Sequence, residues 1–253
     1  MRLWALFLII LWSLVACAEA PAGPEPASGE RACKELSHKG DAYTVCAFSM
    51  SEHEIRLFHS DAEGEPYRQF TTLERELDEQ AYRLIFAMNG GMYHEDRSPV
   101  GFYRDEHGDR ATVNTNDGPG NFHLKPNGVF WIARFQAGVY ESQTYLDLGI
   151  DPIYATQSGP MLVINGELHP GLNPDGTSHR RRNGVGVSED GFMVYFAISD
   201  SAVTFHDFAT LFRDEIGVPN ALFLDGQVSR IFAPEINRNE VGSDLGPIVA
   251  VVE

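Results

Sequence analysis

Basic side chains are scarce in this chain of 253 residues: lysine and arginine total 19, against 36 aspartate and glutamate residues, which gives a formal charge of −17. Proteins that bind nucleic acids need a basic surface to neutralise the phosphates. The charge balance therefore argues against a nucleic-acid partner. An anionic ligand has to be met by a local group of cations, and the only run of three is Arg180-Arg181-Arg182.

Long hydrophobic runs are absent after the first sixteen residues. Arg2 precedes an apolar run from Leu3 to Val15, which is short for a membrane span but has the length of a signal-peptide core. The run ends in Ala16-Cys17, which resembles the cleavage site of a bacterial lipoprotein. We predict a signal peptide over residues 1–16 and lipidation of Cys17, with an ordinary secretory cleavage near residues 18–20 as the alternative. The protein is then exported, either as a periplasmic or outer-membrane lipoprotein or as a secreted protein, and its one membrane contact is the N-terminal lipid anchor.

Cysteine is also rare, since only Cys33 and Cys46 follow Cys17. No Cys-x-x-Cys pair or Cys-His metal spacing occurs, so a redox dithiol and a zinc site are not expected. In an oxidising compartment a bridge between two such cysteines is stable. We predict a disulfide between Cys33 and Cys46, and two reduced, buried cysteines are the alternative.

The remaining chain divides into a tether and one domain. Residues 17–30 are rich in Pro, Ala and Gly and contain no large apolar side chain, which is typical of a flexible tether. No internal repeat and no second linker follows, so residues 31–253 are predicted to form a single domain.

Most predicted elements of that domain are short. The spacing of apolar residues predicts helices over about 72–82 and 204–216, the first opened by a capping box at Thr71 and the second by one at Thr204. Buried strands are expected at 84–88 and 221–224. Two hairpins are expected, one turning at Asn165-Gly166 and one at 189–191. This mixture predicts an α+β fold with a largely antiparallel or mixed sheet.

Polar residues follow several of these strands, and rigid strands that end in polar loops often hold functional groups. Each segment alone is also an ordinary turn sequence. Taken together and in order, they resemble the phosphodiester glycosidase domain family, in its bacterial branch. That family includes the animal lysosomal "uncovering" enzyme, which removes N-acetylglucosamine from a phosphodiester. The segments that carry the resemblance are Asn89-Gly90-Gly91-Met92-Tyr93, Gln157-Ser158-Gly159-Pro160-Met161, Arg182-Asn183-Gly184-Val185-Gly186 and Leu224-Asp225-Gly226.

The resemblance implies an exported hydrolase that cleaves a sugar from a phosphodiester-linked or related anionic glycoconjugate. The chain departs from the animal enzymes in two places: it has Arg-Asn-Gly-Val where they have Pro-Arg-Thr-Ala, and Gln227-Val228-Ser229 where they have Gly-Gly-Ser. The second departure keeps another hypothesis open, a non-catalytic envelope lipoprotein that binds glycans or phosphates with the same residues.

The chemistry needs a carboxylate beside an oxocarbenium-like centre and cations beside the leaving phosphate. Asp225 is the first choice for the carboxylate, and Asp200 is a second candidate. Arg182 is the candidate phosphate clamp, while Arg180 and Arg181 fit a solvated basic turn better. The expected substrate-binding residues are Asn89, Gly90, Gly91, Tyr93, Gln157, Ser158, Gly159, His179, Asn183 and Gly226.

No cofactor is predicted, and a divalent cation stays open. The polar cluster His94-Glu95-Asp96 has no known metal spacing and fits a surface turn. Residues 114–121 are predicted to form a loop that lies over the site.

Overall fold

The computed structural model describes residues 31–226 and 228–253. The predicted signal peptide (1–16), the predicted lipidation site Cys17 and the predicted tether (17–30) lie outside the described residues. Within the described part of the chain, no helix is long and apolar enough to cross a membrane.

The largest sheet has seven strands, and each neighbouring pair is antiparallel. They are β1 (Cys33–His38), β2 (Asp41–Ser49), β10 (Met161–Ile164), β11 (Glu167–Leu168), β12 (Asn183–Val187), β13 (Met193–Ser199) and β14 (Asn220–Asp225), in the spatial order β1-β2-β13-β12-β14-β10-β11. Both predicted hairpins are confirmed as β10-β11 and β12-β13. At the tip of the first, Asn165 and Gly166 have φ angles of 50° and 84°, the positive values that this residue pair favours.

Two five-stranded sheets complete the β structure, again with antiparallel pairing throughout the described strands. One contains β3 (Glu54–Phe58), β4 (Leu84–Asn89), β15 (Ile231–Ala233), β16 (Arg238–Asn239) and β17 (Ile248–Val252), in the order β16-β15-β4-β17-β3. The other contains β5 (Tyr103–Asp105), β6 (Gly108–Ala111), β7 (Gly128–Ile132), β8 (Ala137–Glu141) and β9 (Tyr154–Ser158), in the order β6-β5-β9-β7-β8. The predicted α+β class with largely antiparallel pairing is confirmed.

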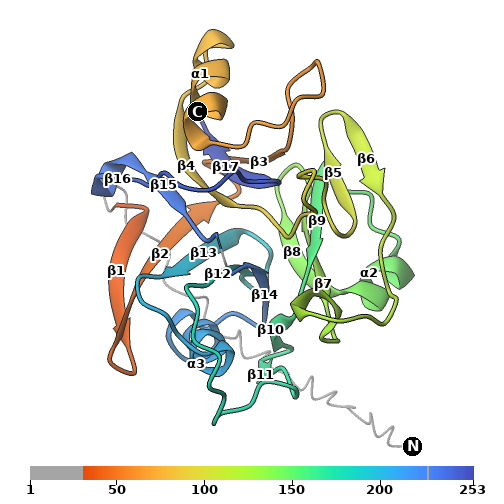
Figure 1. Cartoon of the computed structure of the whole chain (residues 1–253), viewed down its shortest axis with the longest axis vertical. Helices are drawn as coiled ribbons and strands as arrows, with labels where there is room; N and C mark the ends of the chain where they lie inside the picture. The colour runs from red at the N-terminus through yellow and green to blue at the C-terminus, as the bar shows by residue number, and fades with distance from the viewer. Residues whose placement is uncertain (1–30, 227) are drawn as a thin grey trace, which may run out of the picture.

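In the described part of the chain, three helices lie at the periphery, each beside a different sheet (Figure 1). They are α1 (Phe70–Glu79), α2 (Ser142–Leu148) and α3 (Phe205–Thr210), and α3 continues as a π-helical segment, η2 (Leu211–Ile216); short 3₁₀ turns are η1 (Asn121–His123) and η3 (Pro234–Ile236). Each helix packs its apolar face on the outer face of its sheet, in three separate buried clusters. The inner faces of the three sheets therefore share the central core.

Aromatic side chains from all three sheets fill that core. The ring centroid of Phe196 on β13 lies 5.1 Å from that of Phe86 on β4 and 6.1 Å from that of Phe130 on β7. Because one buried ring contacts side chains of both smaller sheets, the three sheets are held in a fixed relation. The loops at their ends are positioned accordingly.

The helix predicted over 72–82 is shifted in the structure. It begins at Phe70 after Gln69, whose side chain makes no capping hydrogen bond, and the capping box predicted at Thr71 is therefore wrong. Phe70 is buried, with its ring centroid 6.4 Å from that of Phe232, so tertiary packing sets the start of the helix. At the other end, Ala81 has a φ of 63°, outside the helix. By contrast, the capping box at Thr204 is confirmed, because its hydroxyl accepts a hydrogen bond of 3.0 Å from the Asp207 amide.

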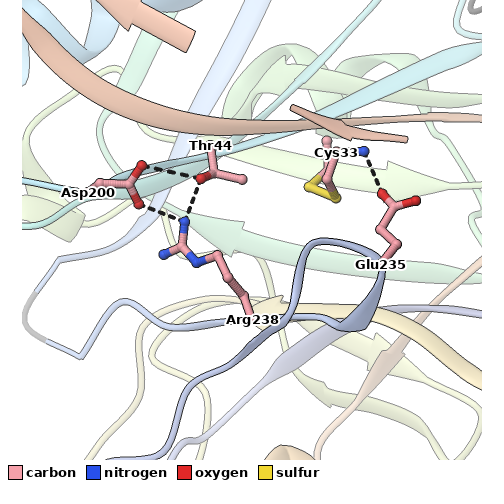
Figure 2. The surroundings of a disulfide bond; sticks show 6 residues. Cys33, Thr44, Asp200, Glu235 and Arg238 are labelled. Atoms are coloured by element: carbon pink, nitrogen blue, oxygen red, sulfur yellow. Dashed lines mark hydrogen bonds and ion pairs between the residues drawn. A yellow bond between two sulfur atoms is a disulfide. The ribbon is translucent and has the colours of Figure 1, made fainter. Parts of the chain in front are cut away.

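The predicted disulfide is present between Cys33 and Cys46, which face each other on β1 and β2. Closing a loop with a sequence separation of 13 contributes roughly 3 kcal/mol by restricting the unfolded chain. Beside it, the carboxylate of Glu235 accepts a hydrogen bond of 2.6 Å from the Cys33 amide (Figure 2). The start of the described chain is thus fixed to β2 and to η3.

Candidate functional site

Three strand ends that are distant in sequence meet at one end of the fold. Asn183 opens β12 and pairs with Asp225, the last residue of β14. Asn89, the last residue of β4, belongs to another sheet, but its side-chain amide donates to Asp225 Oδ2 at 3.3 Å. Antiparallel pairing places the start of β12 next to the end of β14, which explains why these residues come together.

The two asparagines are fully buried and their side chains hold this end rigid. Asn183 Oδ1 accepts from the Asp225 amide at 2.8 Å, and Asn183 Nδ2 donates to the Asn89 carbonyl at 3.1 Å. Asn89 Oδ1 accepts from the Arg230 amide at 2.8 Å, while Asn89 Nδ2 also donates to the Val228 carbonyl at 3.0 Å. Buried polar groups that are satisfied in this way fix one arrangement.

The turn after β14 shapes the surroundings of the carboxylate. The Gly226 amide donates to Asp225 Oδ1 at 2.5 Å, and the Ser229 hydroxyl donates to the Asp225 carbonyl at 2.9 Å. A Cβ at Gly226 would lie 3.1 Å from the Phe223 ring, so the chain approaches closely here. Asp225 itself is half-buried, which leaves part of its side chain exposed to solvent. Asp225, Asn89, Asn183 and Gly226 were all predicted as site residues, and the structure brings them together.

The chain after β4 carries Tyr93 toward the same end. Gly91 has a φ of 154°, and a Cβ there would lie 2.7 Å from Thr156 Oγ1, so glycine is required. The Gly90 amide donates to the Pro247 carbonyl at 2.7 Å, so this expected substrate donor is used within the protein. The Tyr93 hydroxyl donates to the Asp244 carbonyl at 2.8 Å.

Tyr93 also experiences the charges of the site. Burial raises the pKa of Tyr93, the negative charge of Asp225 raises it further, and the positive charges of Arg97 and Arg230 oppose this. The phenol is therefore protonated and a hydrogen-bond donor at neutral pH. Two carboxylates, those of Asp225 and Asp244, and two guanidinium groups act on the same ring, which defines a mixed-charge site around Tyr93.

Arg97 and Arg230 were missed in the sequence analysis. The Arg97 guanidinium lies 5.4 Å from the centroid of the Tyr93 ring, and the Arg97 carbonyl accepts a hydrogen bond of 2.8 Å from the buried ring of His59. Arg230 is buried, and its guanidinium donates to Gln69 Oε1 at 2.9 Å and to the Ser243 carbonyl at 2.5 Å. Only their positions in the sequence could have indicated them: Arg97 lies four residues after Tyr93, and Arg230 lies five residues after Asp225.

The three consecutive arginines have different surroundings. Arg180 is exposed, and Arg181 makes an ion pair of 2.7 Å with Glu240. Arg182 is almost completely buried, with its guanidinium carbon 3.6 Å from the centroid of the Phe205 ring. It donates to the carbonyls of Val203 and Ser178 at 2.9 and 2.8 Å. Burial lowers the pKa of Arg182 to about 10, with a smaller contribution from Arg180. In this structure Arg182 joins the segments beside β12, so a substrate phosphate would have to displace internal contacts.

Asp200 belongs to a separate network around Arg238. Its carboxylate makes an ion pair of 2.7 Å with Arg238 and accepts a hydrogen bond of 3.2 Å from Thr44 (Figure 2). Arg238 also pairs with Glu240 at 2.5 Å, and through Glu240 this network reaches Arg181. In this network the carboxylates of Asp200 and Glu240 therefore neutralise the guanidinium groups of Arg238 and Arg181.

The segment Gln157-Ser158-Gly159 forms the framework behind Asp225. Ser158 is fully buried, and its hydroxyl donates to the Leu224 carbonyl at 3.0 Å. The Gln157 side chain accepts from the amides of Phe102 and Asn114 and donates to the Asn114 carbonyl and to Ser142 Oγ. A Cβ at Gly159 would lie 2.7 Å from the Phe122 carbonyl. These residues position the site, and Gln157 holds the start of the predicted loop 114–121.

His179 is exposed, and its ring nitrogen Nδ1 lies 3.0 Å from the Thr177 carbonyl. His94, Glu95 and Asp96 form an exposed turn, in which Asp96 accepts from Ser98. Across residues 31–226 and 228–253, no group of three or more metal-ligating side chains is placed to hold an ion. The described residues at this end of the fold thus offer a carboxylate, amides, a phenol and guanidinium groups.

Comparison with known proteins shows which family has this sequence and fold. A family model described as phosphodiester glycosidase matches residues 82–245, which include Asn89, Asn183, Asp225 and Arg230. The uncharacterized protein YigE of Escherichia coli K12 is 32% identical over 191 residues, which cover 76% of this chain and 73% of that protein.

Two solved structures share the fold. One is the catalytic domain of zebrafish N-acetylglucosamine-1-phosphodiester alpha-N-acetylglucosaminidase, auto-inhibited by its pro-peptide, with a TM-score of 0.58 and 12% identity over 91% of this chain and 86% of that chain. The other is a hypothetical protein from Synechocystis, with a TM-score of 0.58 and 12% identity over 87% of this chain, which spans only 61% of that protein. With the ordered motifs and the family match, the sequence and the fold agree: this chain belongs to the phosphodiester glycosidase family.

Proposed function

We propose that the protein is a hydrolase that cleaves a sugar from a phosphodiester-linked or related anionic glycoconjugate of the cell envelope. The observation that carries the proposal is the carboxylate of Asp225, held at a strand end by two buried asparagines and facing the mixed-charge surroundings of Tyr93. Membership of the family supports the same reaction class.

The proposed role of Asp225 follows from the transition state. Cleavage of a glycosidic bond passes through an oxocarbenium-like centre, which a nearby carboxylate stabilises as nucleophile, base or electrostatic partner. Hydrogen bonds from Gly226 and Asn89 keep the two oxygens of Asp225 in place, so little reorganisation accompanies the reaction. Asp225 is only half-buried at the end of β14.

The phosphate leaving group explains why the proposed mechanism needs cationic side chains. When the sugar is cleaved from a phosphodiester, the leaving group is a phosphate monoester anion, which needs charge neutralisation more than protonation and suits guanidinium groups. We assign this role to Arg97, which is only partly buried beside Tyr93, with the buried Arg230 as a second positive charge that acts on Tyr93. Arg97 thus replaces Arg182 as the proposed phosphate partner. Because the whole chain has a formal charge of −17, nucleic acid is not among the proposed ligands.

A panel of sugar-1-phosphodiesters and O-glycosides with the same sugars tests the reaction. We expect the purified protein to release reducing sugar from at least one phosphodiester, and at a rate at least about tenfold above that of the matched O-glycoside. Saturable binding of a phosphodiester without release would instead identify the alternative, a non-catalytic glycan- or phosphate-binding lipoprotein. The change to Gln227-Val228-Ser229 beside Asp225 is the sequence feature that favours that alternative.

We further propose that the protein is exported and anchored by a lipid on Cys17, since Cys17 follows an apolar signal-like run. Metabolic labelling with a radioactive fatty acid is expected to mark the wild-type protein and to recover it in the membrane fraction. The Cys17→Ser protein is expected to lose the label. Equal labelling of the two proteins would exclude Cys17 as the lipid site, and a soluble, unlabelled wild-type protein would favour the secreted form.

A further inference from the structure

Several turns gather at the end of the fold opposite Asp225. The turn 133–136 between β7 and β8 contacts the turn 189–192 between β12 and β13, because the Ala137 amide donates to the Gly191 carbonyl at 2.9 Å. The Met50 amide donates to the Phe192 carbonyl at 2.8 Å, which adds the turn after β2. The antiparallel register puts Asn183 and Asp225 at the other end of these strands.

These turns expose large apolar side chains. Phe135 is 60% exposed, Ile153 is 50% exposed and Phe192 is 49% exposed. We call these three residues the tip patch. Beside it runs a groove of about 400 Å³, lined by residues 50–55, 132–135 and 153–154. Single exposed apolar residues are common on proteins, but a group on adjoining turns beside a groove marks a contact surface.

The chain enters the folded body at this same end. The Ala32 carbonyl accepts a hydrogen bond of 2.9 Å from the Ala47 amide, and Cys33 is bonded to Cys46 near the end of β2. The last residue of β2, Ser49, pairs with Met193, the neighbour of Phe192. From Cys17, residues 18–30 therefore lead to the end that carries the tip patch. A flexible linker of this length has an average span of roughly 20 Å.

We propose that the tip patch rests on the surface of a lipid bilayer when the chain is anchored at Cys17, so that the Asp225 end faces away from the membrane. The inference goes beyond the proposed reaction and rests on the proposed anchor. The anchor brings the patch into the range of a bilayer, where the effective concentration of a short tether, on the order of millimolar, makes a weak apolar contact sufficient. Phe and Ile side chains enter the boundary between headgroups and acyl chains favourably.

The charges around the patch select the kind of lipid. Arg134 is the one cation in its turn, and the neighbouring segments carry five acidic side chains, of which Glu54 pairs with Arg56 and Asp151 with Arg104. These are Glu52, Glu54, Asp151, Glu189 and Asp190. An anionic surface would repel this end of the molecule. The bilayer that fits is therefore zwitterionic, such as one of phosphatidylethanolamine and phosphatidylcholine.

The experiment uses the chain from Cys17 to Glu253. Because Cys33 and Cys46 are bonded to each other, Cys17 is the single free thiol and can be coupled to a maleimide lipid in vesicles, whether or not a cell lipidates it. Between Cys17 and Glu253 the one tryptophan is Trp131, which is buried and gives the same background emission in every variant. Single tryptophans are introduced as Phe135→Trp, Phe192→Trp and, as the matched control at the other end, Val241→Trp, since Val241 is 80% exposed.

In zwitterionic vesicles that contain brominated acyl chains, the emission of Phe135→Trp and Phe192→Trp is expected to shift to the blue and to be quenched at least about threefold more than that of Val241→Trp. Replacing a third of the lipid by phosphatidylglycerol is expected to reduce this quenching. Equal quenching at all three positions, or none at Phe135→Trp, would overturn the proposal. A blue shift that grows with protein concentration without vesicles would identify a second copy of the chain as the occupant instead. Failure of the anchor proposal would show separately, in the fatty-acid labelling of cells.

Discussion

Asp225→Asn protein is expected to release sugar at least about a hundredfold more slowly than wild type from the best phosphodiester of the panel. The amide has the same size and its oxygen can still accept the hydrogen bond from the Gly226 amide, while the weaker bond of 3.3 Å from Asn89 Nδ2 to the second oxygen is lost. It lacks the negative charge that the proposed mechanism uses to stabilise the oxocarbenium-like centre. The substitution therefore removes the chemistry while it leaves the turn after β14 in place.

The measurement is steady-state kinetics together with direct binding of the same substrate. A loss in kcat with little change in affinity is the expected pattern, because Asp225 is assigned to the transition state and the guanidinium groups to ground-state phosphate binding. The matched control is Asp151→Asn, an acidic side chain that is 90% exposed at the opposite end of the fold. Undiminished release by Asp225→Asn protein would remove Asp225 from the reaction, and an equal loss in the control would point to a general defect.

Local sequence predicted the elements whose geometry is decided by neighbouring residues. The Asn165-Gly166 turn needs two positive φ angles, and the helix after Thr204 needs one capping hydroxyl. The start of α1 was misplaced because burial of Phe70 against Phe232 outweighs the local capping pattern at Thr71. The order of strands in the three sheets was beyond local patterns, since β2 pairs with β13, and β4 pairs with β15 and β17, across long stretches of chain.

The same limit applies to the site. Asn89, Asn183 and Asp225 were identified because each belongs to a motif that the family resemblance supplies. Arg182 drew attention as part of a basic run, but composition cannot show that a guanidinium is stacked on Phe205 and bonded to buried carbonyls. Arg97 has no cationic neighbour in the sequence, and only the fold brings it over Tyr93. Electrostatic partners that are far apart in the chain must be read from the structure.

The largest expected effect on stability is that of Asn183→Ala. Asn183 is fully buried, and its side chain satisfies the Asp225 amide and the Asn89 carbonyl. Alanine leaves both groups without these partners, and each unsatisfied buried group costs about 1–3 kcal/mol. We expect the free energy of unfolding, measured with urea, to fall by about 2–4 kcal/mol. Asn239→Ala, on the exposed edge strand β16, is the matched control and is expected to change it by less than about 0.5 kcal/mol.

Aspartate has the shape of asparagine but loses the Nδ2 donor that bonds to the Asn89 carbonyl, so Asn183→Asp tests this hydrogen bond separately from the shape of the side chain. The new carboxyl would be buried close to Asp225, so desolvation and a like charge would raise its pKa in the folded protein above the unfolded value. A group whose folded pKa is raised favours the folded state at low pH and loses that contribution as pH rises through the folded pKa. The deficit of this variant relative to wild type is therefore expected to be large at pH 7 and to shrink toward pH 5. A deficit that is constant between pH 5 and pH 7 would contradict a raised pKa for the introduced carboxyl.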